Sequence, residues 1–179
     1  MNLILRFQKM NKNLSRFIDE ILIHQLDAMI RCGAGYLAFG QISIGIEFLG
    51  ACHDSFDFEE PYKSRERFKL GITEYMAKID PRYATYNDAQ SPYYLYKHLR
   101  CGMAHLVRPQ GKVGLTGGDN FTLHLREIKN PDAIILVLNP FFEDFKKACA
   151  ILKSEIPNLS HPKISQIYLP SAPVFTEIH

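Results

Sequence analysis

Residues 93–105 read YYLYKHLRCGMAH, and this stretch decides the expected fold and the expected site. Ser91 and Pro92 suit the N-cap and the first position of a helix, so we expect a helix from residue 92 to about residue 106. Arg100 and His105 lie near its end. A histidine moves protons near neutral pH, and an arginine holds a phosphate that gains charge in a transition state. Together they are the groups that RNA cleavage without a metal requires.

Upstream of this stretch, apolar residues recur at three- and four-residue spacing in three further segments. We expect a first helix with Ser15 as its N-cap and a stop at Cys32-Gly33. Alternation at Ile42, Ile44 and Ile46 is typical of a strand. The apolar segment 36–52 is nevertheless too long for one, which favours a second helix whose glycines allow close helix contacts. A third helix is expected over 62–79, ending at Asp80-Pro81.

Downstream of Pro109, the sequence changes to glycine-punctuated, strand-like segments. Residues 121–128 and 133–138 are strand candidates joined by the turn Lys129-Asn130-Pro131-Asp132, with a possible third strand at 112–115 and an edge strand at 164–169. A fifth helix is expected over 141–156. The predicted fold is mainly α: an up-and-down bundle of four or five helices with a small antiparallel β-hairpin inserted after helix four. A single domain would span 1–179, with a helical core at about 13–108 and 140–156, the hairpin at about 111–139 and an extended tail at 157–179.

Composition limits the classes of partner. Apolar residues make up 46% of the chain and charged residues 22%, which is ordinary for a protein with a sizeable core. The net charge of +2 gives no global attraction to nucleic acid, so any such contact must be local. Cys32, Cys52, Cys101 and Cys149 form no CxxC pair, and three of them lie in apolar or helical stretches typical of small buried thiols. We therefore expect a reduced, cytoplasmic protein that does not span a membrane.

The LRCGMAH string, together with IGIEFLGACHD upstream, resembles the HEPN superfamily, in particular uncharacterised small bacterial members of it. The signature of that group is an arginine followed, after four to six residues, by a histidine near the end of a late helix. The resemblance covers roughly the first 110 residues. It implies a helical bundle, metal-independent RNA cleavage without a cofactor, and a homodimer in which two motifs form one cleft. Arg100 would hold the scissile phosphate and His105 would move the proton of the ribose 2′-hydroxyl, with Tyr96, Lys97 and Cys101 contacting RNA or nucleotide.

The chain departs from that pattern at Cys101, where catalytic members carry Asn, Asp or His. A thiol is a weak hydrogen-bond partner, so a binding or dimerisation module that serves a toxin or a nucleotidyltransferase is an open alternative. Arg100 and His105 also lie about 140° apart around a regular helix. They converge only if the helix unwinds near Gly102 or if one of them reaches the site from the helix end.

Three other readings of the same residues stay open. His98, Cys101 and His105 share one helix face at i, i+3 and i+7 and are ligand types that zinc prefers. The two histidines could instead be core residues bonded to neighbouring carbonyls. Arg100 could simply pair with Asp54 or Asp57 and join two helices. The basic run 63–69 is typical of a solvated helix face, and no glycine-rich phosphate loop or GxSxG motif is present.

Overall fold

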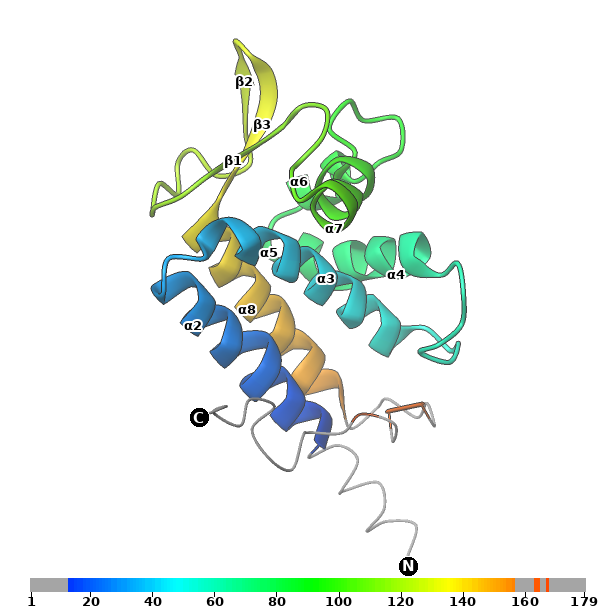
Figure 1. Cartoon of the computed structure of the whole chain (residues 1–179). Helices are drawn as coiled ribbons and strands as arrows, with labels where there is room; N and C mark the ends of the chain where they lie inside the picture. The colour runs from blue at the N-terminus through cyan, green and yellow to red at the C-terminus, as the bar shows by residue number, and fades with distance from the viewer. Residues whose placement is uncertain (1–12, 157–162, 165–166, 168–179) are drawn as a thin grey trace, which may run out of the picture.

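The computed structural model of the chain describes residues 13–156, 163–164 and 167, and in these residues it is mostly helical with one small sheet (Figure 1). Helices α2, α3 and α8 lie side by side, and the sheet sits at one end of them. The elements are η1 (Ile18–Gln25), α2 (Leu26–Arg31), α3 (Gly35–His53), α4 (Ser64–Gly71), η2 (Ile72–Met76), α5 (Ala77–Ile79), α6 (Arg82–Tyr86), η3 (Tyr96–Cys101), α7 (Gly102–Leu106), β1 (Val113–Thr116), β2 (Arg126–Lys129), β3 (Asp132–Val137) and α8 (Leu138–Glu155), where η denotes a π-helical turn.

The first helix runs without interruption from residue 13 to Arg31 through η1 and α2. It stops where the sequence predicts, because Gly33 has φ +88°, a left-handed conformation that glycine adopts without strain. Ser15 lies inside the helical residues 13–17, so the prediction that it is the N-cap is wrong. Cys32 is exposed, unlike Cys52 and Cys149, which corrects its assignment to the buried thiols.

Helix α3 is the centre of the core, which confirms the choice of helix over strand for this segment. Its buried positions include Phe39, Ile42, Ile46 and Leu49, each at most 2% exposed. By length and composition alone α3 could cross a membrane. However, 56% of its apolar window is buried inside the fold, and the core helix of a soluble protein meets the same criterion.

Residues 64–79 form the third predicted helix as α4, η2 and α5. Gly50 of α3 and Gly71 of α4 let the two helices approach closely. A Cβ on Gly50 would lie 1.8 Å from the carbonyl oxygen of Arg67, and one on Gly71 would lie 1.9 Å from that of Ile46. Both distances are far below contact, so this crossing requires glycine at both positions.

The segment between α5 and the motif differs from the sequence prediction. A short helix, α6, occupies part of the segment 82–91 between the third and fourth predicted helices, and the fourth helix begins near Leu95 instead of residue 92. Its capping group is Asn87, whose Oδ1 accepts the backbone N–H of Tyr96 at 3.0 Å. The Ser91 hydroxyl instead accepts the N–H of Tyr93, in the turn before the helix.

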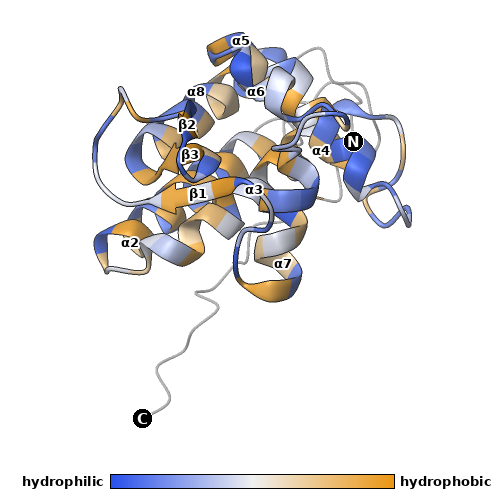
Figure 2. Ribbon diagram, turned by 90° about the horizontal axis from the view of Figure 1, so that it is seen from above, coloured by the Kyte–Doolittle hydropathy of each residue, from blue (hydrophilic) through white to orange (hydrophobic). Residues whose placement is uncertain are grey.

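The sheet is three-stranded and mixed, with strand order β1-β3-β2. β2 and β3 form the predicted antiparallel pair, but β2 covers only the end of the predicted strand 121–128. β1 joins β3 in parallel, with Val113 opposite Ile134, so a simple hairpin is not the complete description. In Figure 2, β1 and β3 are largely hydrophobic, in accord with the buried Ala133, Ile134, Leu136 and Val137 of β3. The predicted edge strand 164–169 lies largely outside the described residues; of its two described residues, Ile164 belongs to a short 3₁₀ turn with Lys163, and Ile167 is in neither a helix nor a strand.

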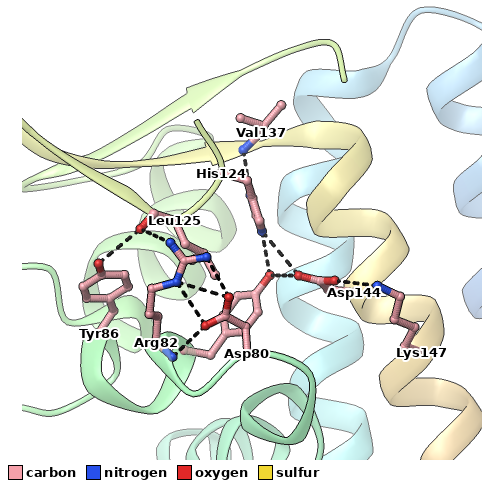
Figure 3. A network of polar contacts seen from close by, with 9 residues as sticks. Asp80, Arg82, Tyr86, His124, Leu125, Val137, Asp144 and Lys147 are labelled. Atoms are coloured by element: carbon pink, nitrogen blue, oxygen red, sulfur yellow. Dashed lines mark hydrogen bonds and ion pairs between the residues drawn. The ribbon is translucent and has the colours of Figure 1, made fainter. Parts of the chain in front are cut away.

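A buried polar cluster joins the sheet to α6 and α8 (Figure 3). His124 Nδ1 accepts the N–H of Val137 at 3.1 Å, and its Nε2 lies 2.9 Å from the Tyr83 hydroxyl. Tyr83 donates to Asp144 Oδ2 at 3.1 Å. Burial, followed by the charge of Asp144, raises the pKa of Tyr83 well above its ordinary value, so this hydroxyl remains a donor. The cluster satisfies the polar groups at the point where β3 ends and α8 begins.

Candidate functional site

The Arg-Cys-Gly-Met-Ala-His motif spans a change in helix type. Arg100 and Cys101 end the π-helical turn η3, and Gly102 begins the α-helical turn α7. The buried side chains of Leu99 and Met103 hold both turns against the core. A π-helical turn is rare and occurs frequently at functional sites.

Arg100 is held by an acidic side chain of α3. Its Nε donates to Glu47 Oε2 at 2.6 Å, and the two side chains are 17% and 19% exposed. Asp54 instead pairs with Arg67. The prediction that Arg100 joins two helices through an acidic partner is therefore right about the link, but the partner is Glu47 and not Asp54 or Asp57. The terminal nitrogens of Arg100 make no hydrogen bond to any described residue. They are therefore available to an anionic ligand.

Ser64 and Tyr96 extend this contact toward α4. The Ser64 hydroxyl donates to the same Glu47 Oε2 at 2.9 Å, and the Tyr96 hydroxyl donates to Ser64 Oγ at 3.4 Å. Glu47 thus accepts from two donors and fixes the orientation of the Arg100 side chain. Sequence reasoning missed Glu47 and Ser64. Glu47 is the only Asp, Glu, Lys or Arg within α3, and that isolation in an apolar helix was the available signal.

His105 lies in the last turn of α7 and is exposed. It makes no hydrogen bond to any described residue, so its ring is open to a ligand. The helix does not unwind at Gly102 but continues through it to Leu106. Arg100 and His105 therefore cannot converge through unwinding at Gly102. They can converge only if His105 reaches the site from the end of the helix. The described residues give no contact between the two side chains.

The turn after His105 has a strained backbone. Val107 has φ +55° and ψ +27°, the left-handed conformation, in which a β-branched residue is an outlier. Tyr36 of α3 donates to the Val107 carbonyl at 3.0 Å and pins the turn. A Cβ on Gly102 would lie 2.6 Å from the carbonyl oxygen of Arg108, so the chain folds back closely over the motif. Such strain is found where a structure fixes a functional geometry.

The three predicted RNA-contact residues differ in exposure. Lys97 is exposed, whereas Tyr96 and Cys101 are half-buried. The Tyr96 ring packs against Phe68 with centroids 5.8 Å apart, so most of its surface serves the fold. Burial is the main cause that raises the pKa of the Tyr96 hydroxyl, and the Ser64 hydroxyl partly opposes it.

The alternative zinc site gains no support from the geometry. His98, Cys101 and His105 all lie in the described part of the chain, where no group of three His, Cys, Asp or Glu side chains could hold a metal ion. The Nδ1 atom of His98 is buried and has no hydrogen-bond partner, which also argues against a satisfied core histidine. Burial and the charge of Lys97 lower the pKa of His98, so its ring is neutral at pH 7.

Comparisons with protein-family models, with curated proteins and with solved structures found no match to this chain. The function of the chain is therefore inferred from the motif at residues 100–105 and from the contact of Arg100 with Glu47 of α3.

Proposed function

We propose that this chain is a HEPN-like, cytoplasmic protein that binds RNA and cleaves it without a metal at Arg100 and His105. The observation that carries the proposal is the state of these two side chains. Arg100 is oriented by Glu47 at 2.6 Å with its terminal nitrogens unbonded, and His105 is exposed one residue before the end of the same helical segment. Neither side chain is sealed inside the core or bonded to the backbone.

The proposed reaction uses one proton acceptor and one anion-binding group. His105 takes the proton of a ribose 2′-hydroxyl, and the 2′-oxygen attacks the adjacent phosphorus. The bond from phosphorus to the 5′-oxygen of the next nucleotide breaks, and that oxygen takes a proton from water, while His105 later releases the proton that it accepted to solvent. The products are a 2′,3′-cyclic phosphate and a 5′-hydroxyl. Arg100 stabilises the charge that develops on the phosphate oxygens.

A homodimer would complete the site, and an exposed apolar surface supports it. We call the following residues the α3–α7 patch; each is 43% to 55% exposed, and they are Tyr36, Leu37, Ile44, Leu106 and Val107. The hydrogen bond from Tyr36 to Val107 joins its two halves beside His105. Contiguous exposed apolar surface of this kind is characteristic of interaction sites. A second copy that covered it would place its own His105 near the same surface.

We expect a solution mass of twice the chain mass of 20.6 kDa, measured by light scattering coupled to size exclusion. Ile44→Glu introduces an unpaired charge into the patch and should yield monomers. Tyr62→Glu is the matched control, because Tyr62 is 98% exposed in the connector between α3 and α4, at the opposite end of α3 from Tyr36 and Leu37. A monomeric wild type, or an Ile44→Glu variant that is still dimeric, would contradict this interface.

A second candidate function is a non-catalytic module that binds RNA or a protein partner such as a toxin or a nucleotidyltransferase. The observation that favours it is the contact between Arg100 and Glu47, because a carboxylate at this distance offsets the charge that a phosphate would use. Cys101 points in the same direction, since a thiol holds a histidine or a substrate weakly. If the wild-type protein does not bind RNA, a protein-binding role is favoured over both RNA cleavage and RNA binding.

RNA cleavage in the presence of EDTA tests the main proposal. We expect the wild-type protein to produce cyclic phosphate ends, and His105→Ala to cleave about a hundredfold more slowly or worse, because it lacks the proton acceptor. His24→Ala is the matched control, since His24 is an exposed histidine in η1, far along the chain from the motif. Equal products from wild type and His105→Ala would mean that another nuclease had contaminated both preparations.

A further inference from the structure

A cavity of about 410 Å³ lies beside α4, η2 and the loop that follows α6. Its volume falls within the range of about 300 to 1,000 Å³ that is typical of small-molecule sites. The polar residues that line it include Arg65, Glu66, Lys69, Asn87, Asp88 and Tyr94. Neither Arg100 nor His105 is among the lining residues, so the cavity is distinct from the site described above.

Two cations in this cavity have no acidic partner among the described residues. Arg65 and Lys69 are one turn apart on α4, and both are exposed. Neither forms an ion pair or hydrogen bond with any residue that the structure describes. The cavity wall also carries two carboxylates, but neither pairs with these cations: Glu66 pairs with Lys63 at 3.0 Å, and Asp88 accepts the backbone N–H of Gln90 at 2.7 Å. Like charges at this spacing repel each other and destabilise a helix, so their presence on one cavity wall suits an anionic ligand.

Asn87 adds a neutral donor to the same cavity. Its side chain is 8% exposed, and its Oδ1 is used by the Tyr96 N–H at the start of η3. The Asn87 amide nitrogen makes no hydrogen bond to any described residue. It is also not one of the fully buried side-chain atoms that lack a partner, so it is open to solvent. It is therefore a fixed donor that can reach a ligand in the cavity. Because the backbone contact holds the side chain in place, this donor is preorganised.

Tyr94 supplies an aromatic surface. It is half-buried in the cavity wall, and its ring lies 6.0 Å from that of Tyr96 at an angle of 49°, so one ring supports the other. An aromatic ring held in this way is a common platform for a nucleobase. A second, more open hollow, beside Tyr93 and Pro92, has Asp88 and Glu127 in its wall and no Lys or Arg. It therefore does not suit an anion.

We propose that the α4 cavity binds a nucleoside monophosphate, with Arg65 and Lys69 on the phosphate and Tyr94 against the base. Asn87 then donates to the base or the sugar. This inference does not require that the protein cuts RNA. A nucleotide in the α4 cavity would also lie near the motif. The Tyr94 ring lies beside the Tyr96 ring, the Tyr96 hydroxyl donates to Ser64, and Ser64 donates to Glu47, which holds Arg100.

Calorimetric titration of the full-length protein tests the proposal, with AMP and UMP as probes and with adenosine and inorganic phosphate as separate arms. We expect the monophosphates to bind more tightly than adenosine or phosphate alone. Lys69→Gln and Arg65→Gln should each weaken AMP binding about tenfold, the usual scale for one charge-assisted contact. Tyr94→Leu should weaken it about fivefold or more through lost stacking. Lys146→Gln removes a charge from α8, outside the cavity, and should leave binding unchanged.

Three results would overturn the proposal: no AMP binding at millimolar concentration, wild-type affinity in both Lys69→Gln and Arg65→Gln, or phosphate that binds as tightly as AMP. Both charged variants change exposed side chains, and a thermal melt confirms that they fold. Arg100→Gln should retain AMP binding. Wild-type protein that binds AMP but does not cleave RNA would count against the proposed nuclease alone, whereas wild-type protein that cleaves RNA but does not bind AMP would count against the cavity alone.

Discussion

Asp54→Asn is expected to lower the free energy of unfolding by about 3 to 5 kcal/mol, the range for removing one partner of a buried ion pair. Asp54 is 7% exposed and accepts from two cations that are buried equally well. Arg67 Nε lies 2.7 Å from its Oδ2, and Lys163 contacts its Oδ1. Without the carboxylate, both cations would stay buried and would each lose the counter-charge that Asp54 supplies. Urea denaturation followed by circular dichroism measures the change.

The same carboxylate makes stability depend on pH. Burial alone would raise the pKa of Asp54, but hydrogen bonds from Lys163 and Arg67 outweigh it and hold the pKa below the ordinary value of 3.8. Because the folded-state pKa is lowered, the stabilisation is complete well above 3.8 and is lost as the pH falls through the folded-state value. Wild type should therefore lose stability more steeply below about pH 4 than Asp54→Asn does. Asp80, Asp132 and Asp144 also have lowered pKa values, so some acid dependence should persist in the variant.

Glu60→Gln is the matched control for Asp54→Asn. It removes a carboxylate from the same connector, but Glu60 is exposed, so the expected change is within about 0.5 kcal/mol. A loss of less than about 1 kcal/mol in Asp54→Asn would mean that the two cations find other partners. An acid slope as steep as that of wild type would mean that Asp54 is not the group responsible.

Gly50→Ala is expected to lower the free energy of unfolding by about 3 kcal/mol, the upper end of overpacking effects, or to prevent folding. The new methyl group would lie 1.8 Å from the carbonyl oxygen of Arg67, which is main chain and cannot turn aside. Separating α3 from α4 would also displace Arg67 from Asp54 and Ser64 from Glu47. The change therefore acts on the core and on the orientation of Arg100 together. Thermal denaturation of the purified variant measures it.

Gly40→Ala is the control within the same helix. A Cβ at Gly40 would lie 3.4 Å from the Cβ of Met103, at the limit of ordinary contact. Alanine is favoured over glycine inside a helix by about 1 kcal/mol, so this variant should be neutral or slightly more stable. If Gly50→Ala and Gly40→Ala melted at the same temperature, the close crossing of α3 and α4 would not be real.

The long helices were predictable because apolar periodicity reports which face of a helix is buried. Segment length identified α3 as a helix despite its local alternation, and the glycines of α3 indicated the close crossing at Gly50. The turn at residues 129–132 was also readable, because Asn130-Pro131 is strong turn chemistry. These features depend on neighbours in the sequence, which a sequence pattern records directly.

The remaining features depend on contacts between distant segments. The parallel pairing of β1 with β3 joins strands separated by the 15 residues 117–131, and no local pattern specifies it. The helix start at Leu95 depends on the side chain of Asn87, and the orientation of Arg100 depends on Glu47, which is 53 positions away. The motif therefore indicated which residues to examine. It did not indicate that one of them is held by an acid of α3 while the other is exposed at a helix end.

The most direct measurement of the central claim uses an oligonucleotide that is 2′-O-methylated everywhere except at one ribose. In EDTA, cleavage through His105 should occur only at that ribose and leave a cyclic phosphate there, because only that sugar has a 2′-hydroxyl to attack with. His105→Ala should lose this product about a hundredfold or more. Cleavage at methylated positions, or the same product at the same rate from His105→Ala, would contradict the role that we assign to Arg100 and His105.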